Sequence, residues 1–219
     1  MSSPCMPLAS TVVPSPGPSR YRDVVKDAIE RPAALLLLVV ASPVMLLLTL
    51  LVTLTSRGPV FHRRRVLGRG GRQFDAFKFR TMCVDADARL ASDPALRAAF
   101  EVNHKLERDP RITWLGGWLR RSSLDELPQL LNIVRGEMSL VGPRMISPAE
   151  LSKYHVHGAK LLTVKPGVTG LWQVSGRQRT SYERRVQLDM EYIDRQSLAL
   201  DLSILARTVP AVLRAEGAH

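Results

Sequence analysis

Residues 32–56 read PAALLLLVVASPVMLLLTLLVTLTS, and this stretch contains no charged side chain. As a straight helix it would extend roughly 37 Å, which is enough to cross a lipid bilayer. On length alone a single transmembrane helix is the ordinary expectation. The stretch decides the fold because the rest of the chain must be arranged around one long, membrane-directed element.

Two features favour a re-entrant element that enters and leaves through the same membrane face. Ser42-Pro43 lies near the middle, where proline removes a helical hydrogen bond and disfavours α geometry in the preceding residue. Both flanks are basic, and Lys and Arg concentrate on the cytoplasmic side of membranes. The flanking cations are Arg20, Arg22, Lys26, Arg31, Arg57, Arg63, Arg64 and Arg65. The sequence therefore predicts a helix hairpin broken at Ser42 and Pro43, with a spanning helix as the alternative.

The charge of the chain points to an anionic partner. Its 219 residues carry a formal net charge of +11, which suits lipid headgroups, nucleotides or nucleic acid. Eight Lys or Arg residues and one acid, Asp75, lie between Arg57 and Arg80, directly after the apolar stretch. Because membrane lipid is the nearest anion there, we do not expect a nucleic-acid partner. Cys5 and Cys83 have no metal-ligand spacing and indicate a reducing compartment without disulfides.

Composition divides the chain into three parts. Residues 1–19 are rich in Pro and Ser and predict a disordered tail. Residues 20–56 predict a membrane-approach helix followed by the membrane element, and residues 57–219 predict a cytosolic domain. In this domain residues 68–72 indicate a turn and residues 73–80 alternate like a strand, which predicts a short β-hairpin.

The remainder of the domain has mainly helical patterns, so the expected fold class is α+β and mostly helical. Residues 127–134 have helical apolar spacing, and Gly136 ends that helix. Residues 198–213 carry one apolar stripe, typical of a core helix or of an amphipathic helix at a membrane interface. The stripe consists of Leu202, Leu205, Val209 and Val212.

Residues 120–130, RRSSLDELPQL, place the carboxylates of Asp125 and Glu126 directly behind an arginine pair. One interpretation is a capping box with Ser123, in which both acids only stabilise a helix start. Pro128 weakens this interpretation, because its missing N–H would fall where that helix needs a donor. With Asp125 as the cap, the two acids lie at a positive helix end and point to different faces. One carboxylate can then attack phosphorus while the other binds Mg²⁺ together with phosphate oxygens.

Four basic residues are candidates for binding substrate phosphates, because guanidinium and ammonium groups match phosphate oxygens. They are Lys78, Arg80, Arg120 and Arg144. Each of them alone would ordinarily be a solvated or lipid-facing surface cation. Arg144 is the most informative of the four, because Gly142-Pro143 fixes the backbone directly before it.

Several segments of the chain carry a resemblance to a known family. They are residues 42–43, 58–61, 77–82, 123–129, 136–144, 165–170 and 172–177. Each segment alone is weak, but their order and spacing are highly specific. From about residue 20 to residue 213 the chain resembles the bacterial sugar transferase family, the monotopic phosphoglycosyl transferases.

The resemblance implies a re-entrant membrane helix and a domain on the cytoplasmic face of the inner membrane, in contact with its lipid. It implies transfer of a sugar-1-phosphate from a UDP-sugar to a polyprenyl phosphate such as undecaprenyl phosphate, with release of UMP. Such a reaction initiates exopolysaccharide or O-antigen assembly. By resemblance Asp125 is the nucleophile that forms an aspartyl phospho-sugar, and Glu126 is the Mg²⁺-associated acid. Lys78, Arg120 and Arg144 match positions linked to phosphate handling.

The chain departs from the family at Met145, where proline is usual, and this relaxes the loop that aims Arg144. It also resembles the minimal form of the family, without the multi-span N-terminal region of larger members. The alternative from another class is a non-catalytic membrane-surface scaffold that binds anionic lipid. In that case Asp125 and Glu126 would be helix caps, and their replacement would change stability and not activity.

Overall fold

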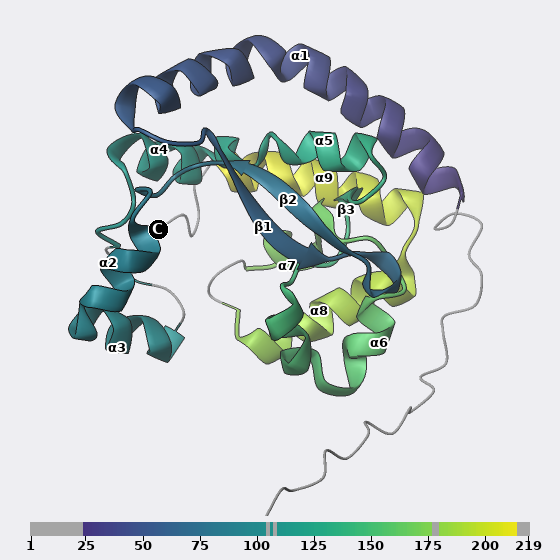
Figure 1. Ribbon diagram of the computed structural model, residues 1–219. Coiled ribbons are helices and arrows are strands. Elements are labelled where there is room, and N and C mark those ends of the chain that lie inside the picture. The colour runs from purple at the N-terminus through teal and green to yellow at the C-terminus, as the bar shows by residue number, and fades with distance from the viewer. Residues whose placement is uncertain (1–23, 104–105, 107–108, 177–179, 214–219) are drawn as a thin grey trace, which may run out of the picture.

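The computed structural model describes residues 24–103, 106, 109–176 and 180–213, so the predicted tail of residues 1–19 lies outside it. This part is mostly helical with two small sheets, as the α+β prediction required (Figure 1). The α-helices are α1 (Lys26–Thr55), α2 (Ala86–Ser92), α3 (Pro94–Asn103), α4 (Trp114–Ser122), α5 (Gln129–Val134), α6 (Gly158–Leu161), α7 (Leu171–Val174), α8 (Tyr182–Arg195) and α9 (Leu198–Leu213). The 3-10 helices are η2 (Arg69–Gly71), η3 (Leu124–Glu126) and η4 (Pro148–His157). The strands are β1 (Phe61–Leu67), β2 (Gln73–Phe79), β3 (Ser139–Val141) and β4 (Gly167–Thr169).

Strands β1 and β2 form the predicted hairpin, an antiparallel pair joined through η2. Its inner face buries Val66, Phe74 and Ala76 against α5 and the first half of α1. His62 pairs with Lys78 in the register, so these two side chains lie on that same face, toward the open end of the hairpin. The hairpin therefore delivers a lysine from a packed strand to the region beneath α1.

A second sheet, which the sequence pattern did not indicate, pairs β3 with β4 in parallel. The two strands continue into backbone contact at Gly142 and Gly167. A Cβ atom on Gly167 would lie 2.1 Å from the nitrogen of Gly142, so only glycine fits there. This close approach fixes the two loops around the Gly-Pro and Pro-Gly dipeptides, and with them the direction of Arg144.

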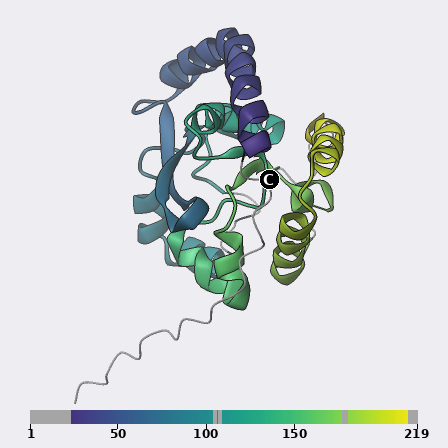
Figure 2. The same cartoon turned by 90° about the vertical axis from the view of Figure 1, so that its right-hand side faces the viewer.

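Helix α1 lies across the top of the domain as a curved arch (Figures 1 and 2). Ala34, near its start, is buried against Leu130 and Ile133 of α5. Leu48 and Val52, near its end, are buried against β2 and α4. The outward side of the helix is apolar and exposed. By length and composition α1 could cross a membrane, but both of its ends are packed on one domain.

The predicted hairpin of two helices broken at Ser42 and Pro43 is not confirmed, because α1 runs through both residues as one helix. The physical reason lies in the hydrogen bonds around the proline. Pro43 has no N–H to donate to the carbonyl of Val39, four residues earlier. The hydroxyl of Ser42 donates to that carbonyl instead, at 2.7 Å. The helix therefore continues through the dipeptide without ending there.

A buried charge network holds the first turns of α1 to the domain. Lys26 Nζ donates to Glu30 at 2.8 Å and pairs with Asp201 of α9. Glu30 accepts hydrogen bonds from the hydroxyl of Ser139 and from the backbone N–H of Leu140, the latter at 3.1 Å. All of the charged members are nearly inaccessible to solvent. Since buried charges are costly unless they are paired, this network specifies where α1 docks.

Two further helices present apolar side chains to the outside. On α9 the predicted stripe is mixed: Leu202 and Val209 are exposed, whereas Leu205 packs partly against the core beside the fully buried Ile204. On α4 the side chains of Trp114 and Trp118, one turn apart, are also exposed. Of the two interpretations of the 198–213 stripe, the structure therefore favours an interfacial helix, because the core is filled from its other face.

Behind the loop that follows β3, a buried carboxylate is held by two donors. Tyr154 donates its hydroxyl to Asp189 at 2.8 Å, and the backbone N–H of Arg144 donates at 3.2 Å. Burial raises the pKa of Asp189 to about 6, even though both donors favour its ionised form. The folded-state pKa thus exceeds that of an unfolded Asp, about 3.9, so stability is lost as the pH rises from about 4 to about 6, and the full cost is present above pH 6.

Tyr154→Phe is expected to lower the free energy of unfolding by about 1.5–3 kcal/mol at pH 7.5, since a hydrogen bond to a buried ionised group is lost. The loss should be smaller at pH 5, where Asp189 is protonated and needs the donor less. Urea unfolding of wild type and variant in detergent at the two pH values measures the difference. An equal loss at both pH values would mean that Asp189 does not titrate in this range.

Candidate active site

Asp125 lies in η3, between α4 and α5, and is only 6% exposed. Ser123 ends α4 in the left-handed region, with φ of 56°, and makes no side-chain capping hydrogen bond at η3. Helix α5 begins only at Gln129, and its cap position is Pro128. Neither of the two capping arrangements expected from the sequence is formed, because the chain inserts a 3-10 turn before the helix starts. The backbone turn instead holds Asp125 inside the domain.

Two cations from other elements act on this carboxylate. Lys78 comes from β2 and Arg120 from the last turn of α4. The Nε of Arg120 donates to the hydroxyl of Thr81 at 2.9 Å, which fixes the guanidinium beside the turn. Hairpin, α4 and η3 thus bring Lys78, Arg120 and Asp125 together, three of the residues predicted for the site.

Desolvation governs the electrostatics of these three residues. Burial raises the pKa of Asp125, and the charges of Lys78 and Arg120 offset this only in part. Burial likewise lowers the pKa of Lys78, although Asp125 and Glu126 favour its charged form. Asp125 forms no ion pair with another described residue. Its carboxylate is therefore near two cations but bonded to neither of them. Such a carboxylate is influenced by both cations without being held in an ion pair.

Glu126 follows Asp125 directly and is half-buried, and its charge acts on Lys78 from the same cluster. The described part of the chain contains no group of three or more His, Cys, Asp or Glu side chains arranged for a metal. Mg²⁺ needs only one or two carboxylates when substrate phosphates supply further oxygens. Glu126, beside Asp125, fits such shared coordination with substrate phosphates, and the pair does not fit a protein-only cage.

Arg80 has partners at the end of α1. Its guanidinium is buried and donates to the carbonyl and the hydroxyl of Ser56, at 2.7 and 3.0 Å, at the C-terminal end of α1. A Cβ atom on Gly58 would lie 2.6 Å from Arg80 Nη1, so the glycine leaves room for this contact. Arg80 therefore links α1 to the hairpin, while its Nε and Nη1 have no partner among the described residues, and its part in phosphate binding stays a prediction.

Arg144 lies in a second cluster. Its guanidinium stands over the indole of Trp172, 5.1 Å from the ring centroid, and that of Arg185 approaches the same ring to 4.5 Å. Arg64 connects this region to Lys78: it lies on the same hairpin face and forms an ion pair with Glu150 of η4 at 2.6 Å.

Two residues near the predicted site were missed by sequence reasoning. His62 faces Lys78 across the hairpin, and burial, with the charge of Lys78, lowers its pKa, so its imidazole is neutral at pH 7. The pairing of His62 with Lys78 would have indicated this residue, but the sequence alone does not give the register of the two strands. Arg185 is one turn from the buried Asp189 on the apolar face of α8, and a charged pair on such a face was the available signal.

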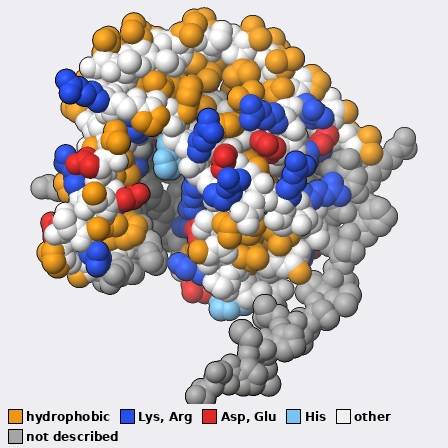
Figure 3. Space-filling view, in the orientation of Figure 1, with side chains coloured by type: hydrophobic (Ala, Val, Ile, Leu, Met, Phe, Trp, Pro, Cys, Tyr) orange, Lys and Arg blue, Asp and Glu red, His pale blue; other side chains and the backbone are white. Residues whose placement is uncertain are grey.

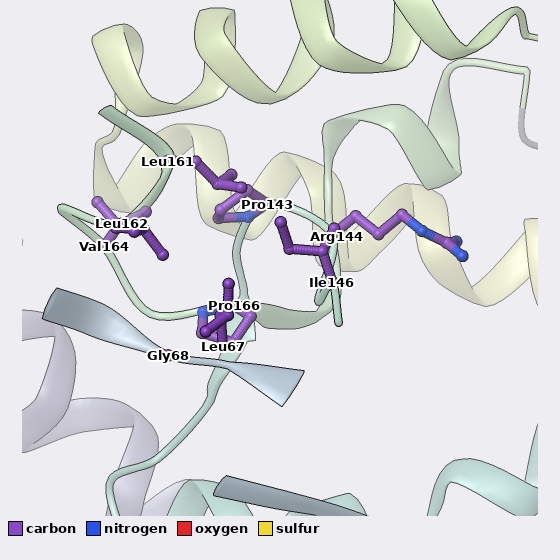
Figure 4. A pocket seen from close by; sticks show the side chains of 9 residues that line it. All are labelled: Leu67, Gly68, Pro143, Arg144, Ile146, Leu161, Leu162, Val164 and Pro166. Carbon is purple, nitrogen blue, oxygen red and sulfur yellow. The ribbon is translucent and has the colours of Figure 1, made fainter. Parts of the chain in front are cut away.

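Lys and Arg side chains gather beneath the apolar arch of α1, over the hairpin (Figure 3). A small pocket between the β1 end and the 161–166 loop is lined by apolar side chains, and Arg144 extends away from it (Figure 4). That pocket is consequently a feature of packing, and the charged site lies outside it.

Known proteins are similar to this chain over most of its length. Residues 21–215 match the family model described as bacterial sugar transferase. The chain is 45% identical over 190 residues to the UDP-galactose-lipid carrier transferase of Erwinia amylovora, covering 85% of this chain and 40% of that protein. It is 44% identical over 190 residues to the exopolysaccharide production protein ExoY of Sinorhizobium fredii, covering 85% and 84%. Over 211 residues it is 38% identical to the UDP-glucose:undecaprenyl-phosphate glucose-1-phosphate transferase of Xanthomonas campestris pv. campestris, covering 91% and 41%.

Fold and site together define a helical domain with one long apolar helix and a carboxylate–cation cluster suited to phosphate groups. The chain belongs to the bacterial sugar transferase family. It spans less than half the length of two of these three relatives and most of the length of ExoY.

Proposed function

We propose that the chain transfers a sugar-1-phosphate from a UDP-sugar to a polyprenyl phosphate, and so begins the assembly of an exopolysaccharide or a related glycan. The observation that carries the proposal is the buried Asp125, which faces Lys78 and Arg120 but is bonded to neither. The names of the relatives support it, since they refer to UDP-sugars, a lipid carrier and undecaprenyl phosphate.

In the first step a carboxylate oxygen of Asp125 attacks the β-phosphorus of the donor. A bond from Asp125 to phosphorus forms, and the bond from that phosphorus to the bridging oxygen breaks. UMP leaves with the bridging oxygen and its electron pair. Lys78 and Arg120 hold the phosphoryl oxygens and stabilise the negative charge that develops there.

In the second step an oxygen of the polyprenyl phosphate attacks the phosphorus of the aspartyl phospho-sugar. The bond to Asp125 breaks and its carboxylate is regenerated, so neither step requires a net proton transfer. Mg²⁺, when bound through Glu126 and phosphate oxygens, would neutralise charge on the donor diphosphate. His62, neutral at pH 7, adds no charge beside Lys78.

The reaction needs a lipid phosphate to reach a site in the domain beneath the membrane surface, and the arch of α1 suits this need. Because both ends of α1 pack on the domain, we propose that the helix enters one leaflet, the inner leaflet on the cytoplasmic face, without crossing the membrane. The scaffold alternative is not favoured, since neither acid has the capping role that it requires.

Cysteine labelling tests the topology. In a chain whose native Cys5 and Cys83 are replaced by Ser, we expect Val24→Cys and Arg57→Cys to react with a membrane-impermeant maleimide from the same side. Both positions are exposed in the structure and flank α1. Intact cells should protect both, and inside-out vesicles should label both. Labelling from opposite sides would establish a spanning helix.

The function itself is tested by UMP release from purified protein with Mg²⁺, undecaprenyl phosphate and a panel of UDP-sugars. Release with one member of the panel identifies the donor. Absence of release with every UDP-sugar and with other nucleotide donors, in protein shown to be folded, would contradict the proposal.

A further inference from the structure

Two guanidinium groups share one indole outside the Asp125 site. Arg144 and Arg185 lie 5.1 and 4.5 Å from the ring centroid of Trp172, and Arg185 also lies 5.6 Å from that of Tyr182. Stacking on an aromatic face is favourable for each arginine. The two like charges repel each other, however, and after burial the charge of Arg144 is the next cause of the lowered pKa of Arg185. We call these four residues the Arg144–Arg185 cluster.

The neighbouring carboxylates are already engaged. Asp189 accepts hydrogen bonds from Tyr154 and from the backbone of Arg144, and Glu150 is paired with Arg64. Within the described part of the chain no carboxylate lies within 4.0 Å of either guanidinium. Asp189 acts on both guanidinium groups from beyond this distance, but neither cation has an ion-pair partner among the described residues.

The same cluster contains buried hydrogen-bonding atoms that have no partner among the described residues. They are Arg144 Nε, Arg185 Nε, Trp172 Nε1 and the Tyr182 hydroxyl. Every one of these atoms carries a proton that it can donate. Buried donors normally have acceptors. A ligand rich in acceptor oxygens and negatively charged, such as a phosphate or diphosphate, would suit these donors and the two guanidinium groups.

The position of the cluster distinguishes two sources of phosphate. In both ribbon views α8 lies below the hairpin while α1 lies above it, so the cluster is on the side away from the apolar helix (Figures 1 and 2). A lipid phosphate arrives from the side of α1, whereas a nucleotide arrives from water. Arg64, which acts on Lys78 and is paired with Glu150, makes the charged surface continuous between cluster and Asp125.

We infer that the Arg144–Arg185 cluster binds the nucleoside diphosphate part of the donor, and that Arg185 is a donor-binding residue. The identity of the donor rests on the proposed function. The cluster would hold the leaving nucleotide while Lys78 and Arg120 hold the transferred phosphoryl group at Asp125.

Binding of UDP to the full-length protein, measured by titration calorimetry in detergent with Mg²⁺, tests this without turnover. Arg185→Gln is expected to weaken UDP binding at least tenfold. Arg184→Gln, the same charge change at the exposed neighbouring residue, should change it less than twofold. Arg185→Lys should fall between them, because lysine restores the charge but not the stacked fork. Unfolding of each variant is measured first; loss of one of two repelling cations is not expected to unfold the domain.

Steady-state kinetics separate the two phosphate sources. Arg185→Gln should raise KM for the UDP-sugar at least tenfold and leave KM for polyprenyl phosphate within twofold. Wild-type affinity for UDP, unchanged in folded Arg185→Gln, overturns the inference, and so does failure of the wild type to bind UDP. A rise in KM for the lipid alone also overturns it. If UDP binding depends on Arg185 but Asp125→Asn retains turnover, the inference stands and the proposed mechanism fails.

Discussion

Asp125→Asn is expected to lower the rate of UMP release by at least roughly 10³-fold, because an amide of the same shape has no carboxylate oxygen to attack phosphorus. The variant should nevertheless fold. Burial already disfavours the ionised form of Asp125, so a neutral amide removes a desolvated charge from the interior. Its urea-unfolding midpoint at pH 7.5 is expected to be equal to or above that of the wild type.

The covalent step gives a second readout of the same residue. Wild type incubated with a radiolabelled UDP-sugar, without lipid acceptor, should retain label on the protein, and Asp125→Asn should retain none. Asp194→Asn is the matched control, since it makes the same chemical change at a half-exposed carboxylate paired with Lys160. Retention of a tenth of wild-type activity by Asp125→Asn would remove Asp125 as the nucleophile. A loss of stability without loss of activity would favour the scaffold.

Lys26→Met is expected to lower the free energy of unfolding by about 3–5 kcal/mol, the cost of removing one partner from a buried charge network. The substitution leaves Glu30 and Asp201 buried without the ammonium group that lies between them. Urea unfolding in detergent measures the loss. Because the network docks α1, the variant should also expose the first half of this helix to proteolysis before the rest of the domain unfolds.

Two controls make this result specific. Arg195→Met breaks an exposed pair with Glu191 on α8 and should cost less than about 1 kcal/mol. The triple variant Lys26→Met, Glu30→Gln, Asp201→Asn should recover much of the stability, because no unpaired charge then remains buried. Equal unfolding midpoints for Lys26→Met and wild type would show that the charge network does not position α1, and that its packing and its other polar contacts do.

Much of the fold could be predicted from local patterns. The alternation of residues 73–80 predicted the β-hairpin, whose strand β2 ends at Phe79. The apolar stripe of residues 198–213 predicted α9. Which side of α9 is exposed depends on the packing, because Ile204 fills the core. The prediction that the structure does not confirm is the break of the helix at Pro43. A proline removes one donor, but whether a helix then ends depends on whether another group takes over the free carbonyl, and here Ser42 does.

The active site was predictable only as a set of residue types. Asp125 and Lys78 were expected to be functional, and the structure brings them together through β2 and η3. Arg80 carries the same charge in the same segment, yet it turns to Ser56, because the strand ends before it. No spacing rule distinguishes these two cations, since their environments are made by elements distant in the sequence.

By itself the sequence determined the family, the long apolar helix, the β-hairpin and the acid pair at Asp125. These features depend on composition and on residues close in the chain. Only the tertiary structure decided that α1 bends across the domain and that Lys78 and Arg120 reach Asp125. It also decided that Arg185 joins Arg144 on Trp172. The reason is that burial and charge pairing depend on distances between side chains far apart in sequence, which are set when the elements pack.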